Sequence, residues 1–322
     1  MDLRIDIPRD APFDVVGFGL NAVDHLCVVD EFPERDTKPR VREFARTPGG
    51  QAASAMVLCS RLGLRSKYVG KVGGEETGSF SLESIRSEGV DVADVVTVPG
   101  VTNQLAMVIV DRGTGERTIL WHRPDEIATL PSEITAEKVA VGRLLLVDGH
   151  DAPAAARAAE LARERGIPVV MDAESVKEGT SDVVALTDVL IASRSFPERF
   201  TGYDNLDDAF GAIRSAGPRV VCVTLGHVGA ILMTEIGWTY SSRAYDVDVV
   251  DTTGAGDAFH GAFIYAMLQG WPVERVLAFS NAAAGLNCTE LGARGGARTL
   301  DDVLELMTSG RRRSCILDTV SP

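Results

Sequence analysis

Residues 249–262 read V-V-D-T-T-G-A-G-D-A-F-H-G-A and combine an acid with a glycine-rich turn. Val247, Val249 and Val250 alternate as in a β-strand, whereas the apolar residues after Gly256 have helical spacing. At such a strand-to-helix turn, unpaired backbone N–H groups and the positive end of the helix dipole face the same point. The stretch therefore predicts a site for a phosphate or another anion.

Asp257 at the start of this helix has two interpretations. In one, Asp257 is a catalytic base that faces a hydroxyl group, and the turn of Gly254, Ala255 and Gly256 neutralises a transferred phosphate. Side chains at the two glycine positions would keep a phosphate from the backbone. In the other interpretation, Asp257 only caps a helix that follows an ordinary tight turn. The spacing alone leaves both open.

Two further stretches place polar or flexible residues beside buried elements. Gly49 and Gly50 precede an apolar helix predicted over residues 52–62. The pair either lets a ligand approach the backbone or simply forms a turn. Asp24 follows a buried strand predicted over residues 13–19, where α/β enzymes collect polar groups, but it could equally be a solvated loop acid.

The elements that must position these residues alternate between strands and helices from residue 143 onward. This order predicts a mostly parallel sheet covered by helices on both faces. Segments at about 24–47 and 99–124 instead contain short alternating runs, and the second carries a hairpin turn, D-R-G-T-G-E. We expect one α/β domain over residues 1–322, with a small β-lid inserted from these two segments.

Composition and net charge argue against some classes of binding partner. The net charge is −14 over 322 residues, which argues against binding to nucleic acid or to an anionic membrane surface. The five cysteines show no C-x-x-C spacing, and most sit in apolar runs, as expected for reduced thiols. The N-terminus has no apolar signal core, and no apolar run approaches membrane-spanning length. We expect a soluble, cytoplasmic protein.

Three motifs resemble those of one enzyme family. D-T-T-G-A-G-D-A-F (251–259) is similar to the C-terminal signature D-T-x-G-A-G-D-x-F of the ribokinase (PfkB-type) carbohydrate kinases. T-P-G-G-Q-A-A-S-A (47–55) resembles the N-terminal signature of that family, and K-Y-V-G-K-V-G-G-E-E-T-G (67–78) resembles a further segment. The resemblance extends over residues 14–302 and is strongest to ketohexokinase-like members. It implies a ribokinase-like three-layer α/β sandwich with a β-lid, and ATP-dependent phosphorylation of a hydroxyl on a small sugar.

The resemblance also implies roles for individual residues. Asp257 would be the base, with the 254–256 turn as the anion hole. Sugar hydroxyls would be bound by Asp24, Gly49, Gly50, Gln51, Ser54 and Arg117. ATP, with its Mg²⁺, would lie against Thr224, Gly226, Gly229 and Asn281. A K⁺ ion beside the turn would use Asp251 and the carbonyl of Thr253.

The sequence departs from the family pattern at three places. Ser54 stands where ribokinase has a sugar-binding asparagine, which argues against ribose as the substrate. His150 lies near the position of a ribokinase glutamate. Ser193 and Phe196 replace the Asn and Glu of the family's N-x-x-E motif, so the outer shell of Mg²⁺ must differ.

Other classes remain open from the sequence. A nucleoside kinase of the same family and a catalytically idle, sugar-binding regulator would share these motifs. A nucleotide-dependent dehydrogenase would need a third glycine in G-F-G-L-N-A. Because lid strands with free edges favour pairing, we expect a homodimer formed through the lid.

Overall fold

The computed structural model describes residues 3–297 and 299–314. Its central feature is an eight-stranded sheet in the order β14-β13-β12-β11-β10-β9-β1-β4. The strands from β12 to β4 run parallel, whereas β13 and β14 pair antiparallel at one edge. Their bounds are β1 Phe13–Phe18, β4 Ser66–Val69, β9 Gly142–Val147, β10 Val169–Ala173, β11 Val189–Ser193, β12 Val220–Thr224, β13 Gly229–Met233 and β14 Thr239–Arg243.

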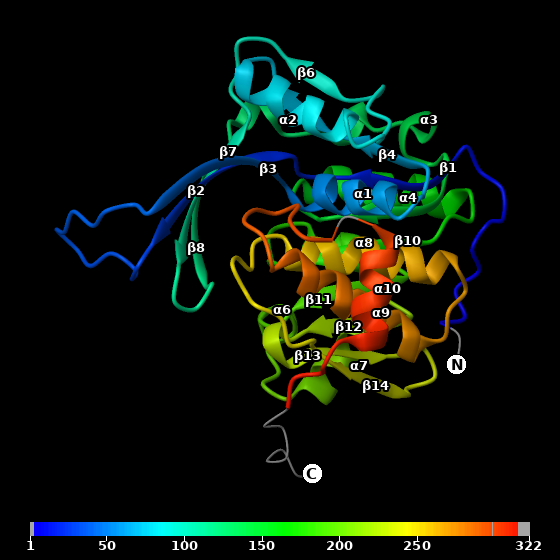
Figure 1. Ribbon diagram of the computed structural model, residues 1–322. Coiled ribbons are helices and arrows are strands. Elements are labelled where there is room, and N and C mark those ends of the chain that lie inside the picture. The colour runs from blue at the N-terminus through cyan, green and yellow to red at the C-terminus, as the bar shows by residue number, and fades with distance from the viewer. Residues whose placement is uncertain (1–2, 298, 315–322) are drawn as a thin grey trace.

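Helices cover both faces of this sheet, because its strands are apolar on both sides. Val15 and Val16, adjacent in β1, enter separate hydrophobic cores. One core contains the front helices of Figure 1, which are α1 Gln51–Arg61, α8 Ala255–Leu268, α9 Val273–Asn287 and α10 Leu300–Ser309. The opposite face carries α3 Ala136–Val139, α4 Ala152–Glu164, α5 Thr180–Ala185, α6 Phe196–Thr201 and α7 Leu206–Ala216. The three-layer α/β arrangement predicted from the sequence, with a mostly parallel sheet between two layers of helices, is confirmed.

A second sheet, the lid, projects from one end of the molecule (Figure 1). Its order is β3-β2-β7-β8, and its strands are β2 Ala22–Val29, β3 Glu43–Gly49, β7 Gln104–Asp111 and β8 Arg117–His122. These strands lie within residues 22–49 and 104–122. Beside them, β5 Lys71–Gly73 pairs with β6 Val96–Val98, and α2 Glu76–Arg86 packs against β5 and β2. The short 3-10 turns are η1 Asp125–Ile127, η2 Pro131–Glu133 and η3 Gly226–Val228.

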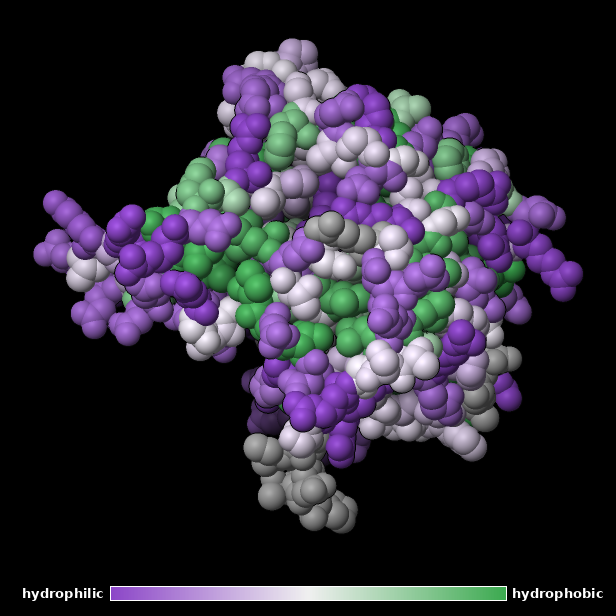
Figure 2. Space-filling view, in the orientation of Figure 1, coloured by the Kyte–Doolittle hydropathy of each residue, from purple (hydrophilic) through white to green (hydrophobic). Residues whose placement is uncertain are grey.

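The lid sheet has two different faces. Leu26, Val28, Ala106, Val108 and Val110 form a small core on the inner face, with Leu291 packed against it. On the outer face, Phe44, Met107 and Leu120 are exposed. Figure 2 shows hydrophobic residues gathered over the part of the lid nearest the body. Among the described residues, no helix is long and apolar enough to cross a bilayer.

Candidate active site

The N-terminus of α8 presents free amide groups. In the described part of the chain, the N–H groups of Gly256 and Asp257 donate to no other group, while that of Ala255 donates to Thr252 O at 3.3 Å. A Cβ added at Gly256 would meet nothing within 4 Å, so the backbone there is open to a ligand. Two unpaired amides at a helix start, with open space before them, fit a phosphate group.

Gly254 bends the chain into this position. Its φ of 73° lies in the left-handed region. An added Cβ would stand 2.1 Å from the carbonyl oxygen of Ala293. Only glycine fits, for both reasons. The contribution of Gly254 in the structure is therefore the bend itself.

Asp257 lies half-buried in the first turn of α8. Burial raises its pKa well above the ordinary range, and the charges of Asp172, Glu174 and Asp24 raise it further, against the effect of His260. A carboxylate with a raised pKa holds a proton more strongly, which suits a base that must accept one from a hydroxyl. The role of Asp257 as the base stays a prediction.

Asp24 belongs to lid strand β2 rather than to a loop, and it is 6% exposed. Its carboxylate lies over Gly49 of β3, where an added Cβ would come within 2.1 Å of Oδ2. Burial raises the pKa of Asp24 to about 6, with Asp251 adding to the effect and Arg294 and Arg117 opposing it. The next residue of the pair, Gly50, has φ 93° and is the N-cap of α1. Because Gly49 has no side chain, the buried carboxylate of Asp24 can lie directly against its backbone.

Arg294 was not singled out by the sequence reasoning, yet it joins the parts of the site. Its guanidinium donates to Gly49 O at 3.1 Å, to Ser54 Oγ at 3.2 Å and to Ser84 Oγ at 3.0 Å. Ser54 is buried, and its hydroxyl is the acceptor for Arg294. Burial lowers the pKa of Arg294 to about 10, Arg61 lowers it further, and the charges of Asp24 and Asp257 act in the opposite direction.

Two other predicted substrate residues, Gln51 and Arg117, have polar partners of their own. The side chain of Gln51, the first residue of α1, hydrogen-bonds the carboxyl of Asp172 and lowers its pKa. Arg117 of β8 donates to Thr252 Oγ1 at 2.9 Å. That bond fastens the lid hairpin to the loop before α8.

The predicted nucleotide residues gather where β12, β13, β14 and α9 meet. Thr224 ends β12, and Gly226 has φ 61° with open space around it. Gly229 is fixed by packing, because an added Cβ would stand 2.0 Å from Ser242 O on β14. Asn281 donates to the same carbonyl at 2.9 Å.

Asp251 and Thr253, the predicted K⁺ ligands, hold the loop before α8 together. Asp251 Oδ1 accepts from Thr253 N and Oγ1 at 2.8 and 2.7 Å, and Oδ2 accepts from Gly292 N at 2.9 Å. The carbonyl of Thr253 accepts from Asn287 at 2.8 Å. Within the described residues, no group of three or more His, Cys, Asp or Glu could hold a metal ion.

A buried pair beneath α8 also went unnoticed in the sequence. His260 lies one turn after Asp257, with Nδ1 2.7 Å from Gly256 O and Nε2 3.6 Å from Asp172 Oδ1. Burial lowers the pKa of His260, whereas burial and neighbouring carboxylates raise that of Asp172. Because Asp257 and His260 are three residues apart, the sequence already indicates that they share one side of the helix.

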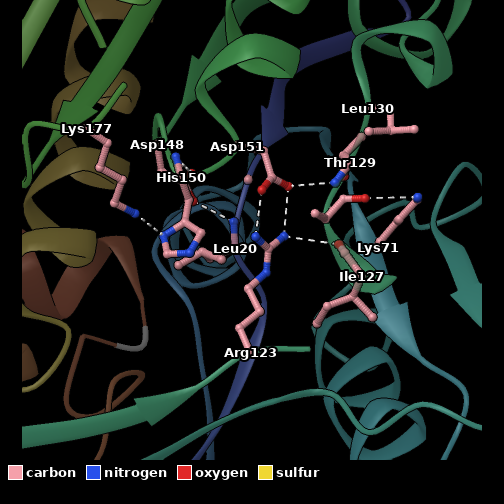
Figure 3. Close-up of polar contacts among 12 residues, drawn as sticks. Leu20, Lys71, Arg123, Ile127, Thr129, Leu130, Asp148, His150, Asp151 and Lys177 are labelled. Carbon is pink, nitrogen blue, oxygen red and sulfur yellow. Dashed lines mark hydrogen bonds and ion pairs between the residues drawn. The ribbon is translucent and has the colours of Figure 1, made fainter. Parts of the chain in front are cut away.

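Polar contacts anchor the lid to the carboxyl end of β9 (Figure 3). Arg123, just after β8, forms two hydrogen bonds to Asp151 at 2.6 and 2.7 Å. Asp148 accepts from the backbone N–H groups of Leu20 and His150. The Arg123–Asp151 bonds therefore join the lid to the segment that follows β9.

Asp24, Asp257 and Arg294 lie close enough for their charges to shift one another's pKa, and the free amides of α8 are those of Gly256 and Asp257. Residues 13–300 match the model of the pfkB family of carbohydrate kinases. The chain belongs to this family. The PfkB kinase is 25% identical to 5-dehydro-2-deoxygluconokinase of Halalkalibacterium halodurans over 95% of this chain and 97% of that protein. It is 30% identical to the ATP-dependent ribose-1-phosphate kinase of Halopiger xanaduensis, over 87% and 93% of the two chains.

A solved ribokinase from Thermotoga maritima has the same fold, with a TM-score of 0.80 at 21% identity over 92% of this chain and 99% of that one. The PfkB kinase is therefore an ATP-dependent carbohydrate kinase with a ribokinase-like fold. The resemblance stated from the motifs is confirmed.

Proposed function

We propose that this PfkB kinase transfers the γ-phosphoryl group of ATP to a hydroxyl of a small sugar, with Asp257 as the base. The observation that carries the assignment is the juxtaposition of a carboxylate of raised pKa with the unpaired N–H groups at the start of α8. Asp257 accepts the hydroxyl proton and orients the oxygen. The turn of Gly254, Ala255 and Gly256 stabilises negative charge on the phosphoryl oxygens.

On the sugar side, we assign hydroxyl recognition to Asp24, to the backbone of Gly49 and Gly50, and to Gln51. Ser54 acts through Arg294, whose Nε donates a hydrogen bond to Ser54 Oγ. Arg117 holds the lid against the loop before α8 through its hydrogen bond to Thr252. Buried polar groups of this kind reject analogues that lack the matching hydroxyl, because the protein groups are then left unpaired.

On the nucleotide side, the assigned residues are Thr224, Gly226, Gly229 and Asn281. The open backbone at Gly226 supports close approach of a ligand. ATP supplies the phosphoryl group, and Mg²⁺ bound to its phosphates offsets their charge. Asp251 and the carbonyl of Thr253 are the candidate groups for a K⁺ ion beside the turn.

Two further assignments complete the proposal. The exposed apolar residues of the outer lid face, Phe44, Met107 and Leu120, support pairing of two lids in a homodimer. We assign the enzyme to the cytoplasm, in keeping with four free cysteines among the described residues; Cys315 lies outside them.

The assignment is tested by incubating the protein with MgATP and separate panels of ketoses, aldoses, sugar acids and nucleosides. ADP release and the mass of the product are measured. We expect a phosphorylated sugar or sugar acid. A phosphorylated nucleoside alone would favour the nucleoside kinase, and sugar binding without any product would favour an idle regulator.

A further inference from the structure

A second polar cluster lies where the lid meets the carboxyl ends of β9 and β10. His150 follows β9, Lys177 follows β10, and Trp121 belongs to β8. Lys177 Nζ lies 3.0 Å from His150 Nδ1, and the Trp121 and His150 rings meet edge to face at 5.8 Å (Figure 3 shows the first contact). None of these three side chains has a role in the assignments above.

The charged side chains of this region differ in whether a partner of opposite charge or a hydrogen-bond donor contacts them. Arg123 and Asp151 neutralise each other, and the Asp148 carboxylate accepts two backbone N–H groups. In the described part of the chain, the Lys177 ammonium hydrogen-bonds only the ring of His150, and no carboxylate lies within 4 Å of it. The Lys177 side chain is exposed, and partial desolvation lowers its pKa against the charges of nearby Asp148, Asp151 and Glu174.

His150 adds a second hydrogen-bond donor. Because an ammonium can only donate, Nδ1 of His150 must accept, and the ring proton then resides on Nε2. Burial and the charges of Lys177 and Arg123 lower the pKa of His150 to about 4. The ring is therefore neutral at pH 7, with one N–H left to offer.

Trp121 of this cluster lies on the same face of the lid as Asp24 of the predicted sugar site. Across the lid, Asp24 pairs directly with Ala106, and Ala106 with Trp121. Directly paired residues lie on the same face of a sheet, so Trp121 and Asp24 share the inner face. Trp121 is 59% exposed there. A sugar held by Asp24 would therefore lie on the same lid face as this aromatic ring, which contacts His150, the partner of Lys177.

We propose that Lys177 and His150 bind an anionic group on the substrate, a carboxylate or a phosphate, so that the enzyme prefers an acidic sugar. The ammonium and the Nε2–H group supply two donors to the anion, and Trp121 covers the apolar face of the sugar. This inference rests on the proposed function, because it names the class of sugar that the same site takes.

The test compares kcat/KM for pairs of substrates that differ by one anionic group: D-gluconate with D-glucitol, and D-ribose 1-phosphate with D-ribose. We expect the acidic member of one pair to be preferred by about 10- to 100-fold, as for a hydrogen-bonded charge in a closed site. The pair that shows the preference distinguishes a carboxylate from a phosphate.

Lys177→Gln should then lower the acidic-to-neutral ratio of kcat/KM at least tenfold, and Lys177→Arg should keep part of it. Lys38→Gln, at an exposed lysine in the loop between β2 and β3, should leave the ratio unchanged. A merely structural defect would lower both members of a pair together. Preference for the neutral member in both pairs, or a ratio unaffected by Lys177→Gln, would overturn the inference while the kinase assignment stands. If no member of these pairs and none of the broader panel is phosphorylated, the proposed function itself fails.

Discussion

The guanidinium of Arg294 donates to the carbonyl oxygen of Gly49 at 3.1 Å, although 245 residues separate them in the sequence. The bond ties the loop after α9 to the turn that begins α1. Through its charge, Arg294 also lowers the pKa of Asp24 in the lid. One side chain therefore fixes the geometry of the substrate turn and favours the ionised form of its carboxylate.

Replacing Arg294 by glutamine should weaken substrate binding and shift its pH dependence. Loss of the buried hydrogen bonds should raise KM about tenfold, on the order of 1–2 kcal/mol. Asp24 has a pKa of about 6, so kcat/KM should fall below that pH as the carboxylate is protonated. Without the positive charge, this acid limb should move to higher pH.

Arg294→Lys is the matched variant, because it keeps the charge but not the three-way bonding. Steady-state kinetics between pH 5 and 8 should show a raised KM with an acid limb near that of the wild type. If the glutamine variant keeps both the wild-type KM and the wild-type limb, Arg294 has no role in positioning the site.

Asp24→Asn should stabilise the fold at high pH while impairing activity. The folded pKa of about 6 exceeds the ordinary value of 3.8, so the folded state holds a proton that the unfolded state has lost between these values. Stability therefore declines as pH rises through this window, by at most about 3 kcal/mol. The variant lacks this ionisation and should gain about 1–3 kcal/mol more at pH 8 than at pH 4.

Urea unfolding of both proteins at the two pH values measures this difference. Asp204→Asn, at an exposed acid, serves as the control and should show little change. If Asp24→Asn changed the free energy of unfolding equally at pH 4 and pH 8, burial would not raise the pKa of this carboxylate.

Gly50→Ala should be more damaging than Gly63→Ala, although the two backbones are alike. Gly50 has φ 93° and Gly63 has φ 91°, so alanine meets a similar backbone penalty of about 1–2 kcal/mol at each. Only at Gly50 would the new Cβ strike backbone, 2.6 Å from Leu20 O and Asn21 Cα. We expect a further loss of about 1–3 kcal/mol there.

Thermal or urea unfolding gives the difference between the two variants, and kinetics should show a raised KM for Gly50→Ala alone. Equal destabilisation would show that the turn before α1 relaxes to admit a side chain, and that its close packing is not needed.

The arrangement of layers could be predicted because it depends on local patterns. Alternating strands and helices after residue 143 specify a covered parallel sheet, and the hairpin turn near residue 113 specifies part of the lid. The position of Asp257 at a helix start also followed from local spacing. These features need no knowledge of distant contacts.

Arg294 could not be found in this way, because its partners Gly49, Ser54 and Ser84 lie more than 200 residues away. Asp148 and Asp172 could have been found. Each comes at or just after the end of a buried strand, which is the rule that was applied to Asp24. Asp24 itself lies inside a lid strand, so the rule selected it for the wrong reason.

Leu120→Glu should weaken association through the lid. Leu120 is 61% exposed on the outer face of β8, and a charge there would oppose burial against a second lid. Sedimentation should show a dimer for the wild type and a monomer for the variant. Ile236→Glu, at a similarly exposed residue between β13 and β14, should leave the dimer intact. A wild type that sediments as a monomer would refute pairing of the lids.

The central claim is that Asp257 deprotonates a sugar hydroxyl beside the amides of α8. The most direct measurement is the rate of phosphoryl transfer from ATP to the best substrate of the panel, for the wild type and for Asp257→Asn, with nucleotide affinity measured in parallel. We predict a fall in kcat of about 10²–10⁴-fold with nucleotide binding largely retained, because the variant keeps the amides but loses the base. Near-wild-type turnover by Asp257→Asn would contradict the account.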